Sequence, residues 1–351
     1  MNVALLVGRF GGGTGTGGVA ATLARGLRDR GHRVLVACGR VDARPEASGD
    51  VGDGFDAVPL GPRWSAAARI PAGFVRLALD RVPGCEVARA SGGVHRRWLD
   101  ARGGRWVGPR DRWECWLDRR TARTAGVVIC NAEQVADAIV AEHQVGRERL
   151  RLVRTGVDLA RFRPDPAARD EARRRLGVPE GGRIAMFVGH GFRRKGLDTA
   201  VAAFARVGGP HDRLVVVGRD AHAERWLGPA RVALGDRLVA DGPRTPIERW
   251  LVAADALLLP SRYDAASNVI LEAMACGVPP IASGRDGASE IVPDGRLVVH
   301  DPADVQGFAD AVRYAWETPG LPAGCRAAAE RWPDSRMTDD VERILGATAH
   351  G

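Results

Sequence analysis

The stretch ALLLPSRYDAASNVILEAMACGVPPIAS, residues 256–283, decides the fold class. It begins with a short apolar run at 256–260 and ends with another at 280–283, and both runs predict buried strands. Residues 267–276 lie between them with helical periodicity, and glycine and proline follow to end the helix. A strand, a helix and a strand in this order predict a parallel sheet that helices cover.

The same alternation occupies most of the chain. Before residue 156 the expected strands are residues 3–8, 33–37, 127–131 and 151–155, and the expected helices are residues 19–30 and 133–142. After a break at 158–166 the expected strands are residues 184–189, 214–218, 256–260 and 280–283, and the expected helices are residues 196–207, 222–234, 246–254, 267–276 and most of 303–347. Two such series predict two doubly wound, Rossmann-like α/β domains, with ligands bound in a cleft between them, beyond the carboxyl ends of the strands.

Composition favours an anionic partner. The net charge is +8 and the sequence pI is about 9.9, which suits phosphate, an acidic lipid surface or nucleic acid. Aromatic residues make up only 5% of the chain and do not alternate with basic residues, so we do not expect nucleic acid as a partner. Residues 81–123 are rich in arginine, tryptophan and glycine without a clean period, which indicates an irregular binding segment or a surface excursion.

Two features bear on location. The six cysteines are scattered and include no Cys-x-x-Cys pair, which favours a reducing cytoplasm over a disulfide framework. The N-terminus enters a strand directly instead of a signal peptide, and no run of about 18 apolar residues could cross a membrane. We therefore expect a cytoplasmic protein whose membrane contact, where it exists, is peripheral at the inner face of the cell membrane.

A glycine-rich loop follows the first predicted strand. Gly13–Gly18 reads GTGTGG and satisfies the dinucleotide fingerprint G-x-G-x-x-G. Several residues separate it from the strand, and the second strand ends without an acid for a ribose, although Arg40 would suit NADP. An NADP-dependent oxidoreductase therefore stays as an alternative. A loop whose backbone N–H groups approach a phosphate or an acceptor is the favoured interpretation.

Lys195 is the only lysine among the 51 basic residues. It stands in GHGFRRKGL, residues 189–197, between a predicted strand and a predicted helix. A compact ammonium at such a junction is suited to neutralising a phosphate, and Arg194 beside it would supply a second cation. The alternative is a solvated lysine that stands there by chance.

Two carboxylates flank the start of the helix in the opening stretch. Ser267 or Asn268 can cap this helix, and the small residues at 265–268 leave its first N–H groups open to an anion. Glu272 could bind the vicinal hydroxyls of a ribose, or it could simply favour the helix dipole. Asp264 could lie beside the group attached to the phosphate, or it could hydrogen-bond the backbone of its own loop.

Together these groups predict a diphosphate site. Arg194 and Lys195 follow one strand and Asp264 follows another strand of the same domain, so both segments can face one cleft. A diphosphate would meet two cations on one side and a helix N-terminus on the other. No metal is then required, and no metal-ligand spacing such as Asp-x-Asp is present. Fixed donors of this kind would stabilise the charge on a departing nucleotide diphosphate.

Several motifs now resemble a known family. They are Asp264-x7-Glu272-Ala273 followed by Gly277-Val278-Pro279, Arg194-Lys195-Gly196, and the run from Arg154-Thr155-Gly156-Val157-Asp158 to Phe162-Arg163-Pro164. In this combination the chain resembles the retaining glycosyltransferases of family four, which have the GT-B fold. The sequence of Tyr263–Val269 is similar to that of the lipopolysaccharide core glucosyltransferases of that family. The resemblance covers nearly the whole chain and is most specific over 184–292.

The resemblance implies a metal-independent hexosyltransferase that retains the anomeric configuration and needs no cofactor. Residues 1–160 would bind the acceptor, residues 161–325 would bind the nucleotide-sugar donor, and residues 326–351 would form a helix that returns to the first domain. The donor would be an NDP-sugar, with UDP-glucose as the first expectation. The acceptor would be a saccharide or lipid-linked molecule such as a lipopolysaccharide core, and the basic surface suggests that it is anionic or presented by an anionic membrane.

The same resemblance implies site roles residue by residue. Arg194 and Lys195 would hold the diphosphate, Glu272 would hold the ribose, and Asp264 would face the donor sugar. The further contacts would be the backbone at Ala266, Ser267, Asn268 and Val269 around the diphosphate, Gly17 and Gly18 near the phosphate and acceptor, Gly242 and Arg244 near the base, and His95 near the reacting sugar. The catalytic set would be Asp264, Lys195, Arg194 and His95, although His95 equally fits a solvated loop histidine.

The chain departs from the family pattern in two places. The first carboxylate of the pair is usually Glu, and Asp264 is one methylene shorter, which leaves its sugar contact and the donor preference open. Gly92 and Gly93 stand where an acidic residue often precedes the histidine. A catalytically idle nucleotide-sugar-binding partner is therefore a further alternative.

Overall fold

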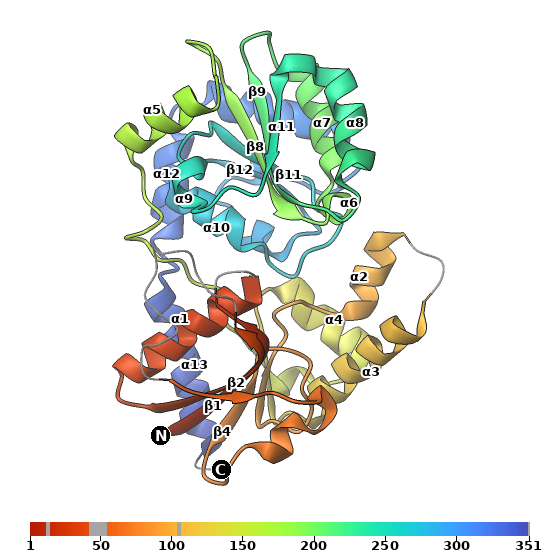
Figure 1. Cartoon of the computed structure of the whole chain (residues 1–351), viewed down its shortest axis with the longest axis vertical. Coiled ribbons are helices and arrows are strands. Elements are labelled where there is room, and N and C mark those ends of the chain that lie inside the picture. Colours follow the sequence, from red (N-terminus) through yellow and green to blue (C-terminus); the bar gives the residue numbers. More distant parts are fainter. Residues whose placement is uncertain (12–14, 42–54, 104–106, 350–351) are drawn as a thin grey trace. The chain divides into compact units, whose positions relative to one another are not determined.

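The computed structural model describes residues 1–11, 15–41, 55–103 and 107–349. They divide into two units, Met1–Gly156 with Asp334–Gly351, and Val157–Pro333. Each unit is built on one parallel sheet flanked by helices, as Figure 1 shows for each in turn. The predicted class, two Rossmann-like α/β domains, is therefore confirmed.

The described part of the first unit contains a seven-stranded sheet in the order β3-β2-β1-β4-β5-β6-β7. Its strands are β1 (Asn2–Phe10), β2 (Arg33–Val41), β3 (Asp56–Pro59), β4 (Val75–Ala78), β5 (Val87–Arg89), β6 (Val127–Cys130) and β7 (Leu150–Leu152). Its α-helices are α1 (Gly15–Asp29), α2 (His95–Arg102), α3 (Pro109–Thr124), α4 (Glu133–His143) and α13 (Asp334–Ala349), and η1 (Arg63–Arg69) and η2 (Arg147–Arg149) are short 3-10 helices. Residues 3–7 of β1 are completely buried, as an unbroken apolar run at the centre of a parallel sheet requires.

The last helix of the chain packs within the first unit. Met337, Val341 and Leu345 of α13 are buried in one core cluster with residues of α1, and their spacing of four places them on one helix face. The two helices approach closely because Gly26 of α1 has no side chain, since a Cβ there would stand 2.8 Å from the side chain of Thr338. Figure 1 shows α13 lying beside α1 in this unit.

The second unit contains a six-stranded sheet in the order β10-β9-β8-β11-β12-β13. Its strands are β8 (Ile184–His190), β9 (Arg213–Arg219), β10 (Leu238–Gly242), β11 (Ala256–Leu259), β12 (Pro280–Ser283) and β13 (Val298–Val299). Its α-helices are α5 (Pro166–Arg175), α6 (Phe192–Lys195), α7 (Leu197–Val207), α8 (Ala223–Leu234), α9 (Glu248–Leu251), α10 (Asn268–Ala275), α11 (Val305–Glu317) and α12 (Leu321–Ala329), and η3 (Gly235–Arg237), η4 (Gly287–Ile291) and η5 (Gly295–Leu297) are 3-10 helices. The central order β8-β11-β12 brings the carboxyl ends of three strands to one edge.

Two expectations about local structure are wrong. The segment at 81–123 is not irregular, because it forms β5, α2 and α3 within the residues described there. The helix expected at 246–254 shrinks to the four residues of α9. The segments β3, β4, β10, β13 and α5 were not predicted at all.

Two further observations complete the description. All six cysteines have free thiols. Among the residues that the structure describes, no helix is both long and apolar enough to span a bilayer.

Candidate functional site

The predicted donor residues gather where β8, β11 and β12 end. The chain leaves β8 at His190 and forms the short helix α6, which ends at Lys195. It leaves β11 at Leu259 and reaches Asp264 before α10 begins. Because these strands are parallel neighbours, their carboxyl ends lie at one edge, and the polar loops that follow them meet there.

Lys195 is buried, with 5% of its surface exposed. Its Nζ lies 2.8 Å from Oδ2 of Asp264 and donates to Oγ of Ser267 at 2.5 Å. The lysine stem crosses Gly189 at the end of β8, where a Cβ would stand 2.9 Å from Lys195 Cγ. Because glycine has no side chain, it leaves room for the lysine stem to pass and for the ammonium to reach α10.

Gly196 is a second glycine that this geometry requires. Its φ is +77°, in the left-handed region, and it separates α6 from α7. A Cβ there would stand 2.0 Å from the carbonyl oxygen of Pro260 at the end of β11. Glycine alone permits both the backbone turn and this close approach, which fixes Lys195 against the neighbouring loop.

Asp264 is the acid that balances both cations. Arg194 Nη1 donates to Asp264 Oδ2 and, at 3.2 Å, to the carbonyl oxygen of Tyr263. Burial of Asp264 favours its neutral form, but the charges of Lys195 and Arg194 outweigh burial and hold the pKa of this carboxyl well below its ordinary value. Asp264 is therefore ionised at neutral pH and orients both cations.

Asp286 is a site residue that the sequence analysis missed. It is completely buried and accepts from the backbone N–H of Ser267 at 2.9 Å and from the Ser267 hydroxyl. Its Oδ2 lies 4.0 Å from Lys195 Nζ, and burial together with the negative charge of Asp264 raises the pKa of Asp286. The available signal was its place, since Asp286 follows the end of β12 as Asp264 follows the end of β11.

The start of α10 presents backbone donors. Ser267 occupies the N-cap, but its hydroxyl bonds Asp286 and Lys195 instead of capping, so the expectation of a side-chain cap from Ser267 is wrong. In the described chain, the N–H groups of Asn268 and Val269 have no acceptor, while that of Ile270 donates to Ser267 O at 3.1 Å. Two unsatisfied N–H groups beside a buried ammonium form a site for an anion.

Glu272 projects from the second turn of α10 and is partly buried. Burial raises its pKa to about 7, with Arg161 opposing the rise and Glu248 adding to it. Arg161 is already engaged, because its Nη2 donates to Glu248 at 2.8 Å. No described residue hydrogen-bonds the Glu272 carboxyl group, so its oxygens are available to hydroxyl donors.

The predicted base contacts lie after β10. Gly242 is the last residue of that strand and has φ +88°, so only glycine adopts its conformation without strain. The Arg244 guanidinium lies over the ring of Trp250, 4.2 Å from its centroid. Ala266 is half-buried directly before the N-cap of α10.

The remaining predicted residues belong to the first unit. Gly13 and Thr14 of the glycine-rich motif lie outside the described residues, whereas Gly17 and Gly18 lie in the first turns of α1. Gly17 O accepts from Gly11 N at 3.3 Å, and a Cβ at Gly18 would meet no atom within 4 Å.

His95 is not a solvated loop histidine, so that interpretation is wrong. It is buried, begins α2 and stacks on Trp98 at 5.1 Å between ring centroids. Its backbone N–H donates to the Asp118 carboxylate at 2.8 Å, and its ring Nε2 lies 3.3 Å from the Asp111 carboxylate. Burial and the charge of Arg81 lower the pKa of the His95 imidazole.

The described residues contain no group of three or more His, Cys, Asp or Glu placed to hold a metal ion.

Comparisons with known proteins define the class. WaaG, a glycosyltransferase involved in lipopolysaccharide biosynthesis, has a similar fold, with a TM-score of 0.81 at 20% identity over 98% of this chain and 99% of that one. HepE of Anabaena, solved with UDP and glucose, gives a TM-score of 0.75 at 18% identity over 99% and 100% of the two chains. The two units therefore form the GT-B fold of glycosyltransferases.

The family follows from the sequence. The profile of Glycosyltransferase Family 4 matches residues 13–161, and that of Glycosyl transferases group 1 matches residues 182–318. The chain belongs to the family-four glycosyltransferases.

Curated relatives agree with this assignment. The D-inositol 3-phosphate glycosyltransferase of Acidothermus cellulolyticus is 35% identical over 61% of this chain and 50% of its own length. The glycogen synthase of Mycobacterium tuberculosis is 32% identical over 73% of this chain and 59% of its own length. The chain thus spans about half the length of the curated relatives it matches.

Proposed function

We propose that this chain transfers a hexose from a nucleotide-diphosphate sugar, with UDP-glucose as the first donor to test, to a saccharide or lipid-linked acceptor such as a lipopolysaccharide core. The observation that supports this most is the buried Lys195 ammonium. It is hydrogen-bonded to the N-cap of a helix whose first two N–H groups have no acceptor among the described residues. HepE, of similar fold, is described in complex with UDP and glucose. The Lys195 ammonium and the two helix N–H groups together suit a diphosphate.

The proposed chemistry needs charge stabilisation at the departing diphosphate. The bond between the sugar C1 and a phosphate oxygen breaks while the acceptor oxygen bonds C1, and the acceptor proton passes to the departing diphosphate. Arg194, Lys195 and the N–H groups of Asn268 and Val269 would bear the new negative charge, and losing one such donor costs about 3–4 kcal/mol in the barrier. Glu272 would accept from the ribose hydroxyls, and Asp264 would face the sugar. We propose retention of configuration on the family resemblance. We propose no metal requirement because the two cations and the helix N–H groups would meet the diphosphate charge.

The donor proposal is tested by a panel of nucleotide sugars. Thermal shift and hydrolysis are measured with UDP-glucose, UDP-galactose, GDP-mannose and ADP-glucose, with and without a chelator. We expect UDP-glucose to stabilise the protein and to turn over in the presence of the chelator. Lys195→Ala should abolish turnover, whereas the matched control Arg193→Ala, an exposed cation of the same short helix, should keep it.

Each other outcome has a defined meaning. Full turnover in Lys195→Ala would refute the site assignment, and a strict metal requirement would contradict the charge scheme. Binding of UDP without any hydrolysis or transfer would favour the catalytically idle partner that the shorter Asp264 suggested. Family membership removes the oxidoreductase alternative.

We further propose that the first unit touches an anionic membrane at the inner face of the cell membrane. Trp113 and Trp116 of α3 are 43% and 44% exposed and stack at 4.8 Å. Trp64 of η1 is 59% exposed, and η1 is joined to α3 by the ion pair of Arg63 with Glu114. The exposed arginines of α3 are Arg110, Arg112, Arg119, Arg120 and Arg123. Exposed tryptophans with basic neighbours suit an interface of anionic lipids.

The membrane proposal is tested by co-sedimentation with vesicles. Phosphatidylglycerol vesicles should retain the wild-type protein at low salt, and phosphatidylcholine vesicles should not. The double variant Trp113→Ser with Trp116→Ser should weaken retention, and equal retention by both proteins would refute the role of α3.

A further inference from the structure

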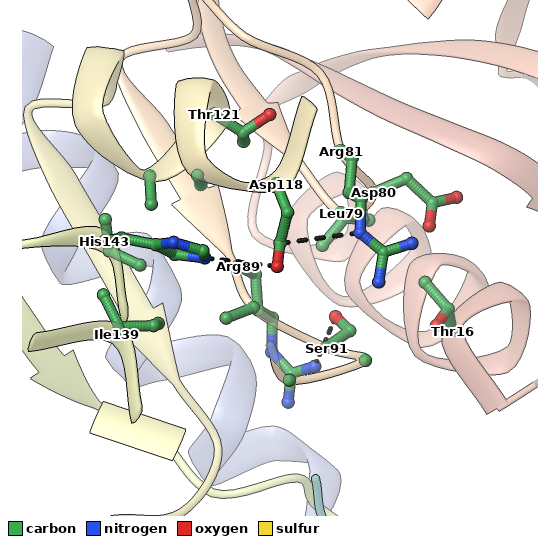
Figure 2. Close-up of a pocket in the computed structure, with 16 residues that line it drawn as sticks. Thr16, Leu79, Asp80, Arg81, Arg89, Ser91, Asp118, Thr121, Ile139 and His143 are labelled. Atoms are coloured by element: carbon green, nitrogen blue, oxygen red, sulfur yellow. Dashed lines mark hydrogen bonds and ion pairs between the residues drawn. The ribbon is translucent and has the colours of Figure 1, made fainter. Parts of the chain in front are cut away.

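The first unit contains a partly open cavity of about 70 Å³ near the carboxyl ends of β4 and β5. Thr16 of α1 lines one side, Thr121 of α3 and His143 of α4 line others, and Arg89 and Ser91 follow from β5. Figure 2 shows these side chains around the cavity. Every lining residue belongs to the first unit, so the lining includes none of the donor residues described above.

Arg89 is a buried cation without a carboxylate partner. Only 3% of its surface is exposed. Its Nη1 donates to Ser91 Oγ and its Nη2 donates to Thr155 Oγ1, both at 2.9 Å. A guanidinium has five N–H donors, and in the described chain Arg89 Nε has no acceptor and no acid pairs with this side chain.

The acids that line the same cavity are engaged elsewhere. Asp118 lies 3.5 Å from Arg81 Nε and 3.2 Å from His143 Nε2, as the dashed lines in Figure 2 mark. Asp80 accepts from the backbone N–H of Gly8 at 2.7 Å. Arg81 is itself shared with Glu114, 3.2 Å away. Asp118 is thus paired with Arg81 and His143, and Asp80 is bonded to a backbone N–H. Among the described residues, Arg89 hydrogen-bonds only the hydroxyls of Ser91 and Thr155.

A buried, unpaired charge is costly unless an opposite charge joins it. Burial lowers the pKa of Arg89 to about 10, so the group still bears its proton at neutral pH. An anion in the cavity would use the idle N–H donors, and a planar guanidinium matches the oxygens of a phosphate or a carboxylate. The open space beside Gly92, where a Cβ would meet no atom within 4 Å, leaves room for the rest of such a molecule.

We propose that this cavity binds the anionic group, a phosphate or a carboxylate, of the acceptor, and that Arg89 is the residue that pairs with it. The inference rests on the proposed function and makes it more specific, because it assigns an acidic acceptor and the place where its charge is held. Thr16 and Ser91 also line the cavity, and their hydroxyls would be further hydrogen-bond donors to the anion.

The experiment measures anion binding to the full chain by titration calorimetry and thermal shift. Inorganic phosphate, glucose 6-phosphate, glucuronate and neutral glucose are compared at constant ionic strength. Phosphatidylglycerol vesicles form a separate arm, which distinguishes a lipid headgroup from a soluble phosphate. We expect phosphate and glucose 6-phosphate to bind and neutral glucose not to bind.

Three variants locate the binding. Arg89→Met should weaken phosphate binding at least about tenfold. Arg33→Met removes an exposed arginine of the same unit that belongs neither to the cavity nor to the α3 surface, and it should leave binding unchanged. Ala122→Leu keeps every charge and fills the cavity from α3, so it should also weaken binding, and it keeps the test valid where Arg89→Met alters folding.

The failures are distinguishable. Equal phosphate binding by wild type, Arg89→Met and Ala122→Leu would overturn the inference. So would the failure of phosphate, glucose 6-phosphate and glucuronate to bind a protein that binds and hydrolyses UDP-glucose. Binding to vesicles that Arg89→Met leaves intact, without binding of soluble phosphate, would also overturn it and would assign the charge to the α3 surface. Failure of UDP-glucose turnover with Arg89-dependent phosphate binding would count against the proposed function alone.

Discussion

Replacing Asp264 by asparagine should destabilise the second unit while strengthening the binding of UDP. Lys195 Nζ is 2.8 Å from the Asp264 carboxylate, and this pair attracts by about 6 kcal/mol at an effective dielectric constant near 20. Desolvation of both groups offsets part of that attraction, and removing one partner of a buried pair costs about 3–5 kcal/mol. In Asp264→Asn, Lys195 and Arg194 keep their charges without the acid between them. A diphosphate would then find two unneutralised cations.

The assay separates the two effects. Hydrogen exchange followed by mass spectrometry on peptides from β11 and α10 reports the local free energy of opening, and calorimetry reports the affinity for UDP. We expect opening to become easier by about 3 kcal/mol and UDP to bind more tightly. Asp198→Asn is the matched control, because Asp198 pairs with Arg262 at 2.7 Å at an exposed place of the same unit and should change stability by less than about 1 kcal/mol.

The lowered pKa of Asp264 also predicts how stability changes with pH. The folded-state pKa of Asp264 is lowered, so its stabilisation is present at neutral pH and is lost as the pH falls below about 4. Asp264→Asn should therefore flatten the acid limb of the stability curve. If hydrogen exchange in α10 and the affinity for UDP were both the same in Asp264→Asn as in the wild type, the view that Asp264 balances the two cations would be refuted.

Three other predictions concern the same unit. Burial raises the pKa of Glu272 to about 7, so the wild-type protein should lose roughly 3 kcal/mol of stability in urea titrations as the pH rises from 4.5 to 7. Glu272→Gln should remove this loss and should weaken UDP binding. A wild-type protein equally stable at both pH values would contradict this. Gly196→Ala should cost at least about 2 kcal/mol through strain and a backbone clash, whereas Gly228→Ala inside α8 meets no atom within 4 Å and should be neutral or stabilising in thermal unfolding. Ser267→Ala deprives buried Asp286 of one donor and should cost about 1–3 kcal/mol, and the idea fails where the melting temperature does not move.

The structure also shows which elements the sequence could predict. The opening stretch was predictable because β11 and β12 are short, fully buried apolar runs and Gly277 and its neighbours end α10. Strand β3 was not, since all four of its residues are exposed and leave no apolar pattern. Helices α2 and α3 escaped for a related reason, because they bury few apolar side chains and α3 turns its tryptophans outward.

The donor site was partly predictable. The loops after parallel strands placed Lys195, Arg194 and Asp264 at one edge, and the structure brings them into contact. For Asp286 the sequence offered only its place after β12, because its bonds to Ser267, nineteen positions earlier, become visible only in the fold. His95 was misjudged because its burial depends on residues of α3 that follow in the chain.

The place of α13 has a consequence for synthesis of the protein. Its buried residues complete the core of a unit whose other elements end at Gly156, so the ribosome makes the whole second unit before that core can close. During this interval the face of α1 that packs on α13 is exposed in the nascent chain and is open to chaperones or to aggregation. Released chains that end at Pro333 should therefore contain a folded second unit and an incomplete first one.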